Sequence, residues 1–378
     1  MDKTVLFVSG MFRSGTTLLA RMLNNHPNIA FASDPLRPLI NSFRFDCIRD
    51  DSNCSRFAPL YDYFLEYSKL REVIDGKLDL PIGGEQKELW KTIKSSAEPY
   101  SNLWADKVDV NNTTDTYAEA LDYGLKLISE TYSKGISETC IGFKEVWGTE
   151  FSSALLQGIS NSKCLIIVRD PRAVVASKNS TDEPYPIFFL ARQWRKIAFL
   201  ANKLQQYYPE RVHIIRYEDL ITDPKLESGK MCEFIGLEMH GDFLDAASFK
   251  DGEGKPWSQN SSYTYDNGKQ FQTLSVEKWK SKLSDSDVSL TELICHDWMN
   301  HFGYQPCNDS QSLLNRATTY FTRLDTAELA EWIKPYNFDE SIVEFHKQVT
   351  IEKLRLSSVK NEVPLDLADD LQIVVSDS

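Results

Sequence analysis

A glycine-containing segment near the start of the chain has the residue types of an anion site. It reads Gly10-Met11-Phe12-Arg13-Ser14-Gly15-Thr16-Thr17, and its two glycines are spaced as in a Walker A loop. Backbone amides in such a loop, together with the start of a following helix, suit a phosphate. Thr16 occupies the place of the Walker lysine, so Arg13 is the cation that the loop offers. The segment therefore predicts an anion site other than a standard nucleoside triphosphatase loop, with an ordinary glycine turn as the alternative.

Arg169 and Ser177 form a second candidate anion site. Arg169 ends the apolar run Cys164–Val168, and Ser177 follows in a segment that begins a helix. An arginine at a strand end and a hydroxyl one or two helical turns later can converge on one phosphate. A structural ion pair of Arg169 with Asp170 or Glu218 is the alternative.

The segments that must position these residues alternate between strand and helix. Apolar runs at Val5–Val8, Cys164–Val168 and Val212–Ile215 predict buried strands, and Thr16–Asn25 has apolar residues at helical spacing. His26-Pro27 ends that helix, because proline lacks an amide donor. We expect an α/β fold, a P-loop-like three-layer sandwich with a central, mostly parallel sheet and with ligands at the carboxyl ends of its strands.

The rest of the chain is expected to surround this core. Residues 1–306 form one domain, and a stretch at about 36–140, with a helix at Tyr117–Lys134, is an insertion that shapes the pocket of a second substrate. A helix at about Asp285–His301 closes the core. Residues 307–378 form a mainly helical extension with an acidic end.

Composition narrows the class of partner. Apolar residues make up 42% of the chain, which is enough for a buried core, and 42 Lys and Arg against 55 Asp and Glu give a net charge of −13. Nucleic acid and anionic membrane surfaces are therefore disfavoured, and local groups must hold any anionic ligand. The run Val5–Val8 is too short for a signal peptide, and no segment reaches the about 18 apolar residues of a membrane span. We expect a cytoplasmic protein.

The seven cysteines include no CxxC pair and no Cys/His cluster at metal-ligand spacing, so the sequence predicts no metal site. A reduced compartment fits best, with a Cys47–Cys54 bridge left open.

Four ordered motifs resemble those of sulfotransferases that use 3'-phosphoadenosine 5'-phosphosulfate (PAPS). Ser9–Leu19 with Asn25-His26-Pro27 resembles the family's 5'-phosphosulfate loop, especially in its tyrosylprotein and bacterial branches. The other matching segments are Val168–Ser177, similar to the 3'-phosphate segment, Arg216–Leu220, similar to the next strand end, and Lys278-Trp279-Lys280 with Phe302-Gly303-Tyr304, similar to the closing elements. The likeness spans about residues 4–306 and implies a sulfotransferase catalytic domain of the EC 2.8.2 type.

The resemblance implies PAPS as co-substrate and 3',5'-diphosphoadenosine (PAP) as product. It assigns the 5'-phosphosulfate to Arg13, Ser14, Gly15, Thr16 and Thr17, the 3'-phosphate to Arg169 and Ser177, and the neighbourhood of the adenine to Tyr217. Plain packing is the alternative for Tyr217. The Arg-Lys-Gly triplet of cytosolic relatives is absent near Lys278, so Ser275 and Lys278 are the expected substitutes.

Sulfuryl transfer needs a base, an in-line approach and positive charge on the leaving oxygen, but neither a metal nor a covalent intermediate. By resemblance to tyrosylprotein-type relatives the base is Asp34, an aspartate where they have glutamate. Lys144, with Arg13, is expected to stabilise the transferring group, and Glu145 is a reserve base. Val146 stands where cytosolic relatives have a catalytic histidine. The alternatives are an Asx turn at Asp34 and a solvated strand end at Lys144 and Glu145.

Other functions stay open at this level. A P-loop small-molecule kinase is one, because residues 165–170 could be a strand that ends in a Walker B acid. A noncatalytic nucleotide-binding protein is another. The long aromatic insertion and the acidic composition favour a hydroxyl or amine of a small metabolite, such as a cationic natural product, as acceptor, with protein tyrosine or glycan as the alternative. A homodimer is left open.

Overall fold

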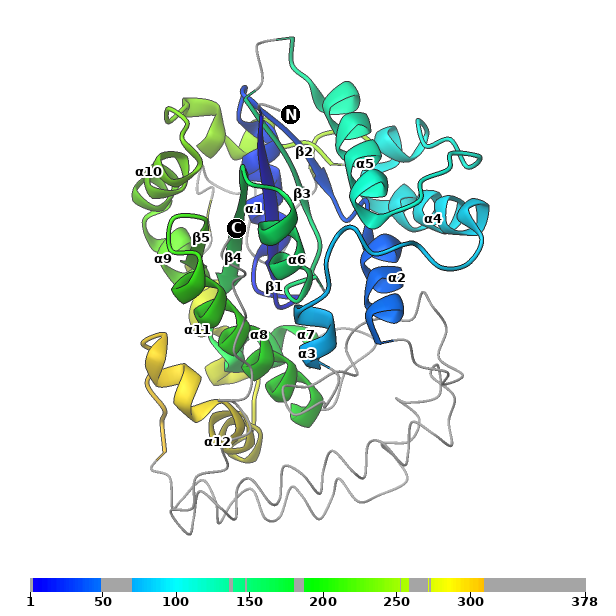
Figure 1. The fold of residues 1–378 in the computed structure, drawn as a ribbon. Helices are drawn as coiled ribbons and strands as arrows, with labels where there is room; N and C mark the ends of the chain where they lie inside the picture. Colours follow the sequence, from blue (N-terminus) through cyan, green and yellow to red (C-terminus); the bar gives the residue numbers. More distant parts are fainter. Residues whose placement is uncertain are drawn as a thin grey trace.

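A parallel sheet lies at the centre of the molecule (Figure 1). The structure, a computed structural model, describes residues 3–48, 70–135, 139–146, 148–179, 187–251, 253–257, 271 and 273–308. Within them the sheet has five strands in the order β2-β3-β1-β4-β5, each pair parallel. The strands are β1 (Thr4–Gly10), β2 (Ile29–Ser33), β3 (Cys140–Lys144), β4 (Ser162–Val168) and β5 (Val212–Arg216).

Helices and short 3-10 turns connect the strands. The α-helices are α1 (Thr16–Asn25), α2 (Arg37–Ile48), α3 (Leu70–Ile74), α4 (Gln86–Ala105), α5 (Tyr117–Tyr132), α6 (Phe151–Gly158), α7 (Pro171–Asn179), α8 (Ile187–Tyr207), α9 (Tyr217–Thr222), α10 (Pro224–Ile235), α11 (Leu274–Glu277) and α12 (Asp285–His301). The 3-10 turns are η2 (Gly241–Leu244), η3 (Ala246–Ser248) and η5 (Lys278–Ser281).

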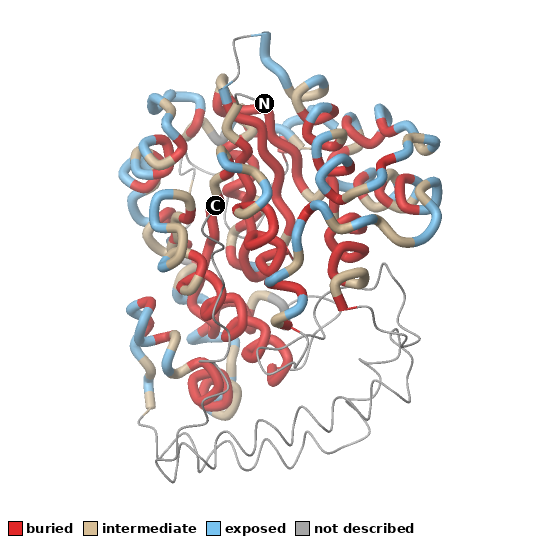
Figure 2. The backbone as a smooth tube through the Cα atoms, viewed as in Figure 1, coloured by how far each residue is buried: buried red, intermediate tan, exposed pale blue. Residues whose placement is uncertain are grey.

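Two apolar layers cover the faces of the sheet. Side chains alternate along a strand, so Val5 and Phe7 of β1 face one layer while Leu6 and Val8 face the other. Helices α1, α9 and α10 pack on the side of Leu6, and α2, α5, α6 and the second half of α8 pack on the side of Phe7. Figure 2 shows that buried residues run through the sheet and the inner faces of these helices. The predicted α/β architecture in three layers is confirmed.

A third apolar cluster lies beyond the carboxyl ends of the strands. It joins α7, the first half of α8 and α12 to Met11 and Val168. Figure 1 shows α7, α11 and α12 gathered at this end of the molecule. The expected closing helix therefore packs beside the loop that follows β1.

Most predicted elements are present. The helices at Thr16–Asn25 and Asp285–His301 have the predicted bounds, and α5 ends at Tyr132 instead of Lys134. The described part of the insertion is helical. Strand β2 and the long helix α8 were not predicted, and the extension beyond Asn308 lies outside the described residues.

The structure bears on two further predictions, the open Cys47–Cys54 bridge and the absence of a membrane-spanning segment. Cys47 carries a free thiol whose pKa burial raises to about 12, while Cys54 lies outside the described residues. Of the helices that the structure describes, none combines the length and the apolar character that a membrane crossing requires.

Candidate active site

The parallel register brings the candidate residues to one edge of the sheet. Lys144 pairs with both Val8 and Ser33, and Val168 pairs with Arg216. The residues that follow β1, β2, β3, β4 and β5 therefore share the carboxyl edge, where ligands of open parallel sheets bind. The order of the sheet places β1 in the middle of this edge, with β2 and β3 on one side and β4 and β5 on the other.

The loop from Gly10 to Gly15, called the anion loop below, has an unusual backbone. Gly10, Arg13 and Gly15 have φ values of 148°, 67° and 96°. A Cβ atom on Gly10 would lie 2.4 Å from the carbonyl oxygen of Ile167, and one on Gly15 would lie 2.5 Å from the Tyr217 ring. Both glycines are therefore required by close neighbours, and Thr16 and Thr17 begin α1 directly after the loop.

Two arginines meet beside the anion loop. Arg13 Nε donates a hydrogen bond to Ser177 Oγ at 2.9 Å, and Arg169 Nη1 donates to the carbonyl oxygen of Arg13 at 2.8 Å. Arg169 Nη2 donates to the carbonyl oxygen of Ser275 at 2.7 Å. The structure thus brings together Arg13, Arg169 and Ser177, which the sequence placed on two separate segments.

These arginines carry positive charge without a counter-charge. In the part of the chain that the structure describes, neither Arg13 nor Arg169 forms an ion pair. Burial, and then the neighbouring charge of Arg169, lower the pKa of Arg13. Ser14 Oγ and Arg169 Nε are buried there without a hydrogen-bond partner. Because unpaired buried polar atoms are costly, the cluster fits a bound anion.

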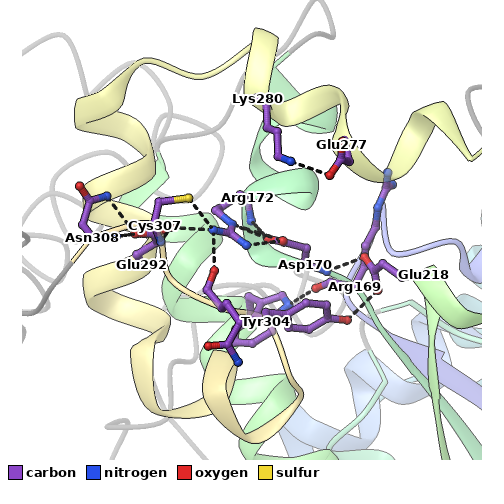
Figure 3. Close-up of polar contacts among 12 residues, drawn as sticks. Arg169, Asp170, Arg172, Glu218, Glu277, Lys280, Glu292, Tyr304, Cys307 and Asn308 are labelled. Carbon is purple, nitrogen blue, oxygen red and sulfur yellow. Dashed lines mark hydrogen bonds and ion pairs between the residues drawn. The ribbon is translucent and has the colours of Figure 1, made fainter.

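The alternative ion pairs of Arg169 are not formed. Asp170 pairs instead with Arg172, at 2.7 Å, and Glu218 accepts the Asp170 amide at 3.0 Å and the Tyr304 hydroxyl at 2.8 Å (Figure 3). Arg169 is only 5% exposed and keeps its guanidinium toward the anion loop. The structural-partner interpretation of Arg169 was therefore wrong.

Tyr217 and Ser275 both contact Arg169. The Tyr217 ring is fully buried with its centroid 4.2 Å from Arg169 Cζ, and its hydroxyl lies 2.7 Å from Ser275 Oγ. A role of Tyr217 beside an adenine stays a prediction. Of the two expected C-terminal contacts, Ser275 is buried in this cluster, whereas the side chain of Lys278 is exposed at the start of η5.

A carboxylate and an amine meet on the side of β1 where β2 and β3 lie. Lys144 Nζ forms an ion pair with Asp34 Oδ2, and their side chains are 3% and 14% exposed. Asp34 has φ of 50°, and its amide donates to the carbonyl oxygen of Lys144 at 2.8 Å. Lys144 and Glu145 are 2% and 1% exposed, so the interpretation of these residues as a solvated strand end was wrong.

Ser101, which the sequence analysis did not single out, contacts the strand that precedes Asp34. Its hydroxyl donates to the carbonyl oxygen of Ser33 at 2.8 Å and accepts the Ser33 amide at 3.0 Å, next to Asp34. Helix α4 is kinked at Ser101, with φ of −148°, two residues after Pro99. A proline within a helical pattern predicts such a kink and was the available signal.

Two protein-family models match this chain. A sequence model of the sulfotransferase family matches residues 6–63 and 83–241, more than half of the chain, and a sulfotransferase domain model matches residues 194–303. The chain belongs to the sulfotransferase family. It is therefore a transferase of the EC 2.8.2 type, and the kinase alternative is set aside.

Known relatives of this sulfotransferase are distant. It is 20% identical over 357 residues to carbohydrate sulfotransferase 1 of Danio rerio, covering 83% of this chain and 80% of that protein. It is 25% identical over 186 residues to carbohydrate sulfotransferase 3 of Tetronarce californica, covering 42% and 40%.

Solved structures similar to this sulfotransferase include two domains of biosynthetic enzymes. The sulfotransferase domain of the Synechococcus PCC 7002 olefin synthase matches with a TM-score of 0.49 and 17% identity, covering 80% of this chain and 94% of that one. The sulfotransferase domain of the curacin biosynthetic pathway matches with a TM-score of 0.46 and 16% identity, covering 81% and 99%.

Proposed function

We propose that this sulfotransferase takes a sulfuryl group from PAPS and transfers it to an acceptor hydroxyl, with Asp34 as base. The observation that carries the proposal is the pairing of two sites at one sheet edge. Arg13 and Arg169 supply uncompensated positive charge, and Asp34 with Lys144 supplies a proton acceptor and a cation across β1. An anionic donor and a hydroxyl acceptor need these two sets of groups.

The donor end of the site would hold the nucleotide. When bound, PAPS supplies the sulfuryl group, on a sulfur whose bond to the bridging oxygen can break. Ser14, with its unpartnered Oγ, and the start of α1 at Thr16 and Thr17 fit the 5'-phosphosulfate. Arg169 and Ser177 fit the 3'-phosphate, and Arg13 of the anion loop contacts both of them.

The acceptor end of the site would carry out proton transfer. As the acceptor oxygen forms its bond to sulfur, the bond from sulfur to the bridging oxygen breaks and its electron pair stays on the nucleotide. The acceptor proton passes to Asp34. Lys144 keeps its charge throughout and stabilises the negative charge that develops on the leaving oxygen. This arrangement requires no covalent enzyme intermediate.

A carbohydrate hydroxyl is the acceptor class that the relatives' names favour, since the curated proteins that match this chain are called carbohydrate sulfotransferases. The small cationic metabolite expected from the net charge of −13 is the second candidate. A cytoplasmic location, a homodimer and the exclusion of nucleic-acid and membrane partners stay predictions from the sequence.

The test combines nucleotide binding with an acceptor panel. Calorimetry with PAP should show binding that does not depend on added metal. Incubation with PAPS labelled in its sulfuryl group should then label neutral oligosaccharides in preference to a tyrosine peptide or a small phenolic amine. Absence of PAP binding would overturn the proposed donor, and exclusive labelling of the phenolic amine would overturn the proposed acceptor class.

Replacement of the base separates binding from chemistry. Asp34→Asn should leave PAP affinity within about twofold and lower the transfer rate by at least about a hundredfold, the usual contribution of a general base. PAPS turnover with water as acceptor, measured as PAP formation, gives the rate without any choice of acceptor. Full activity of this variant would remove Asp34 from its role.

A further inference from the structure

Glu145, the residue that follows β3, is buried beside the proposed base and lysine. It is 1% exposed, and its Oε1 accepts the backbone amide of Leu36 at 2.5 Å. Its Oε2 is also buried and has no hydrogen-bond partner among the residues that the structure describes. A reserve base would need a route to the acceptor, whereas this carboxyl group is directed at the protein backbone.

The backbone of Glu145 is held on both sides. Its amide donates to the carbonyl oxygen of Val8 at 3.0 Å. Its carbonyl oxygen accepts the Ser9 hydroxyl at 3.0 Å and the Gly148 amide at 3.3 Å. The side chain therefore starts from a fixed point on the central strands, which is the requirement for a group that positions another.

The segment that Glu145 holds is the turn that carries the base. Leu36 lies two residues after Asp34 and is fully buried against Gly124 of α5. The Asp34 amide is bound to the carbonyl oxygen of Lys144 at 2.8 Å, and the Asp34 carboxylate is paired with the Lys144 amine. Lys144 and Glu145 thus hold the turn at three points, in a conformation in which Asp34 has φ of 50°.

We propose that Glu145 is a positioning residue of the transfer step, which fixes the Asp34 turn against Lys144 and does not itself take the acceptor proton. This inference rests on the proposed function, because it concerns the geometry of the proposed base. It predicts that Glu145 acts through its hydrogen bond and its neutrality, not through a negative charge.

Charge in the site agrees with a neutral Glu145. Burial, and then the neighbouring carboxylate of Asp34, raise the pKa of Glu145 well above its ordinary value, against the smaller opposing effects of the Leu36 amide, Lys144 and Arg37. A neutral Glu145 leaves Lys144 paired with Asp34 alone. When Asp34 takes up the acceptor proton, Lys144 then has no remaining carboxylate partner, and its charge becomes available to the leaving oxygen.

The experiment compares Glu145→Gln with Glu145→Ala. PAPS turnover with water as acceptor should fall at least tenfold in Glu145→Ala, with PAP affinity within twofold, because the Leu36 amide loses its partner. Glu145→Gln keeps a neutral oxygen in the same place and should restore most of that loss. Loss of turnover in Glu145→Gln equal to that in Asp34→Asn would show that Glu145 is the base and overturn the proposal, as would full activity of Glu145→Ala.

A second readout needs neither nucleotide nor acceptor. Infrared spectra of the free protein at neutral pH should contain carbonyl stretches of un-ionised carboxylic acids; Glu145→Gln should remove one of them, and Asp34→Asn should retain it. Removal of carboxylate bands by Glu145→Gln would instead show an ionised Glu145 and overturn the proposal. If the wild type binds no PAP, the proposed function fails while this measurement still reports on Glu145.

The pH dependence of stability also reports whether Glu145 is protonated in the folded chain. The folded chain keeps a proton on Glu145 that the unfolded chain releases above its ordinary pKa, so stability falls as pH rises from that value to the raised folded pKa. Glu145→Gln should remove this part of the decline. A decline unaltered by Glu145→Gln would contradict a neutral Glu145.

Glu218 offers a matched control. It is a half-buried glutamate that accepts a backbone amide at a strand end, that of Asp170 at 3.0 Å, and burial raises its pKa too. It lies on the nucleotide side of β1. Glu218→Ala should weaken PAP binding and leave turnover at saturating PAPS close to that of the wild type; a loss of turnover equal to that of Glu145→Ala, with PAP affinity kept, would refute a specific role for Glu145.

Discussion

Backbone strain in this protein falls on proposed functional residues. Among the described residues, Arg13 and Asp34 are the non-glycine residues with positive φ, at 67° and 50°. This conformation costs a residue with a side chain roughly 1–2 kcal/mol, and such costs persist where function requires a particular geometry. The proposed donor-site arginine and the proposed base are thus both held in conformations that propensity alone would not select.

Substitution of Arg13 should separate this strain from nucleotide binding. Arg13→Ala and Arg13→Gly both remove the guanidinium and should both weaken PAP binding at least about tenfold, as expected for hydrogen bonds to charged groups. Arg13→Gly should unfold with a free energy about 1 kcal/mol higher than Arg13→Ala, because glycine tolerates positive φ. Urea denaturation and PAP calorimetry measure the two effects.

An arginine at the opposite end of the sheet is the control. Arg211 Nε donates to the carbonyl oxygen of Ser162 at 2.9 Å, before the start of β5. Arg211→Ala should lower stability and leave PAP affinity as it is. Equal weakening of PAP binding by Arg211→Ala would mean that the loss in the Arg13 variants is not local.

At the scale of elements, the kink of α4 ties the insertion to the base. Strand β2 is at the edge of the sheet, and Ser101 supplies to Ser33 the hydrogen bonds that another strand would otherwise provide. Since Asp34 follows Ser33 directly, the position of α4 and that of the base are connected through one hydroxyl group.

Removal of this hydroxyl should affect both stability and turnover. Ser101→Ala leaves a buried amide and carbonyl of Ser33 unpaired, which should lower the free energy of unfolding by about 2 kcal/mol. PAPS turnover should fall more than PAP affinity, because the perturbation lies on the side of Asp34. The exposed Ser95 of the same helix provides the control, and a Ser95→Ala variant with equal losses would contradict the proposed link.

Local patterns predicted some elements well and missed others for physical reasons. Thr16–Asn25 and Asp285–His301 were predicted because apolar residues recur at helical spacing between clear end signals. Strand β2, Ile29–Ser33, is buried throughout and contains two alanines, so it shows neither alternation nor strong strand propensity. It is a strand because β3 pairs with it.

The composition of the site could be predicted, but its internal contacts could not. Resemblance identified Asp34 and Lys144 separately, yet their ion pair joins positions 110 residues apart and depends on the pairing of β2 with β3. The contact of Arg13 with Ser177 spans 164 residues and depends on β1 lying next to β4. Such contacts follow from strand order, which short motifs do not encode.

For the whole molecule, one buried network joins the nucleotide side to the end of the described chain. Arg172 pairs with Asp170 at 2.7 Å and with Glu292 of α12 at 2.7 Å, and its Nη1 donates to the carbonyl oxygen of Gln305 at 3.1 Å (Figure 3). Its Cζ lies 4.1 Å from the centre of the Trp279 ring. The closing helix is therefore bound to the segment that carries Arg169; the domain boundary at about residue 306 stays a prediction.

Loss of Arg172 should destabilise the whole unit. Arg172→Ala leaves Asp170 and the fully buried Glu292 without their cation, and the free energy of unfolding should fall by about 3–5 kcal/mol. The exposed pair of Lys280 with Glu277, at 2.5 Å, is the control, because its loss should cost less than about 1 kcal/mol. Urea denaturation of Arg172→Ala and Lys280→Ala measures the two losses. Similar midpoints would show that the network of Arg172 does not stabilise the fold.

The central strand β1 separates the proposed donor side of the sheet from the proposed acceptor side. Proposed donor residues follow β1, β4 and β5, and proposed acceptor residues follow β2 and β3. Of the described helices between β2 and β3, α4 and α5 pack on the acceptor half. Changes in these helices should therefore act first on the acceptor half. A scaffold built this way can be adapted to new acceptors by exchanging one contiguous stretch of sequence, which makes residues 37–132 the natural target for engineering acceptor choice.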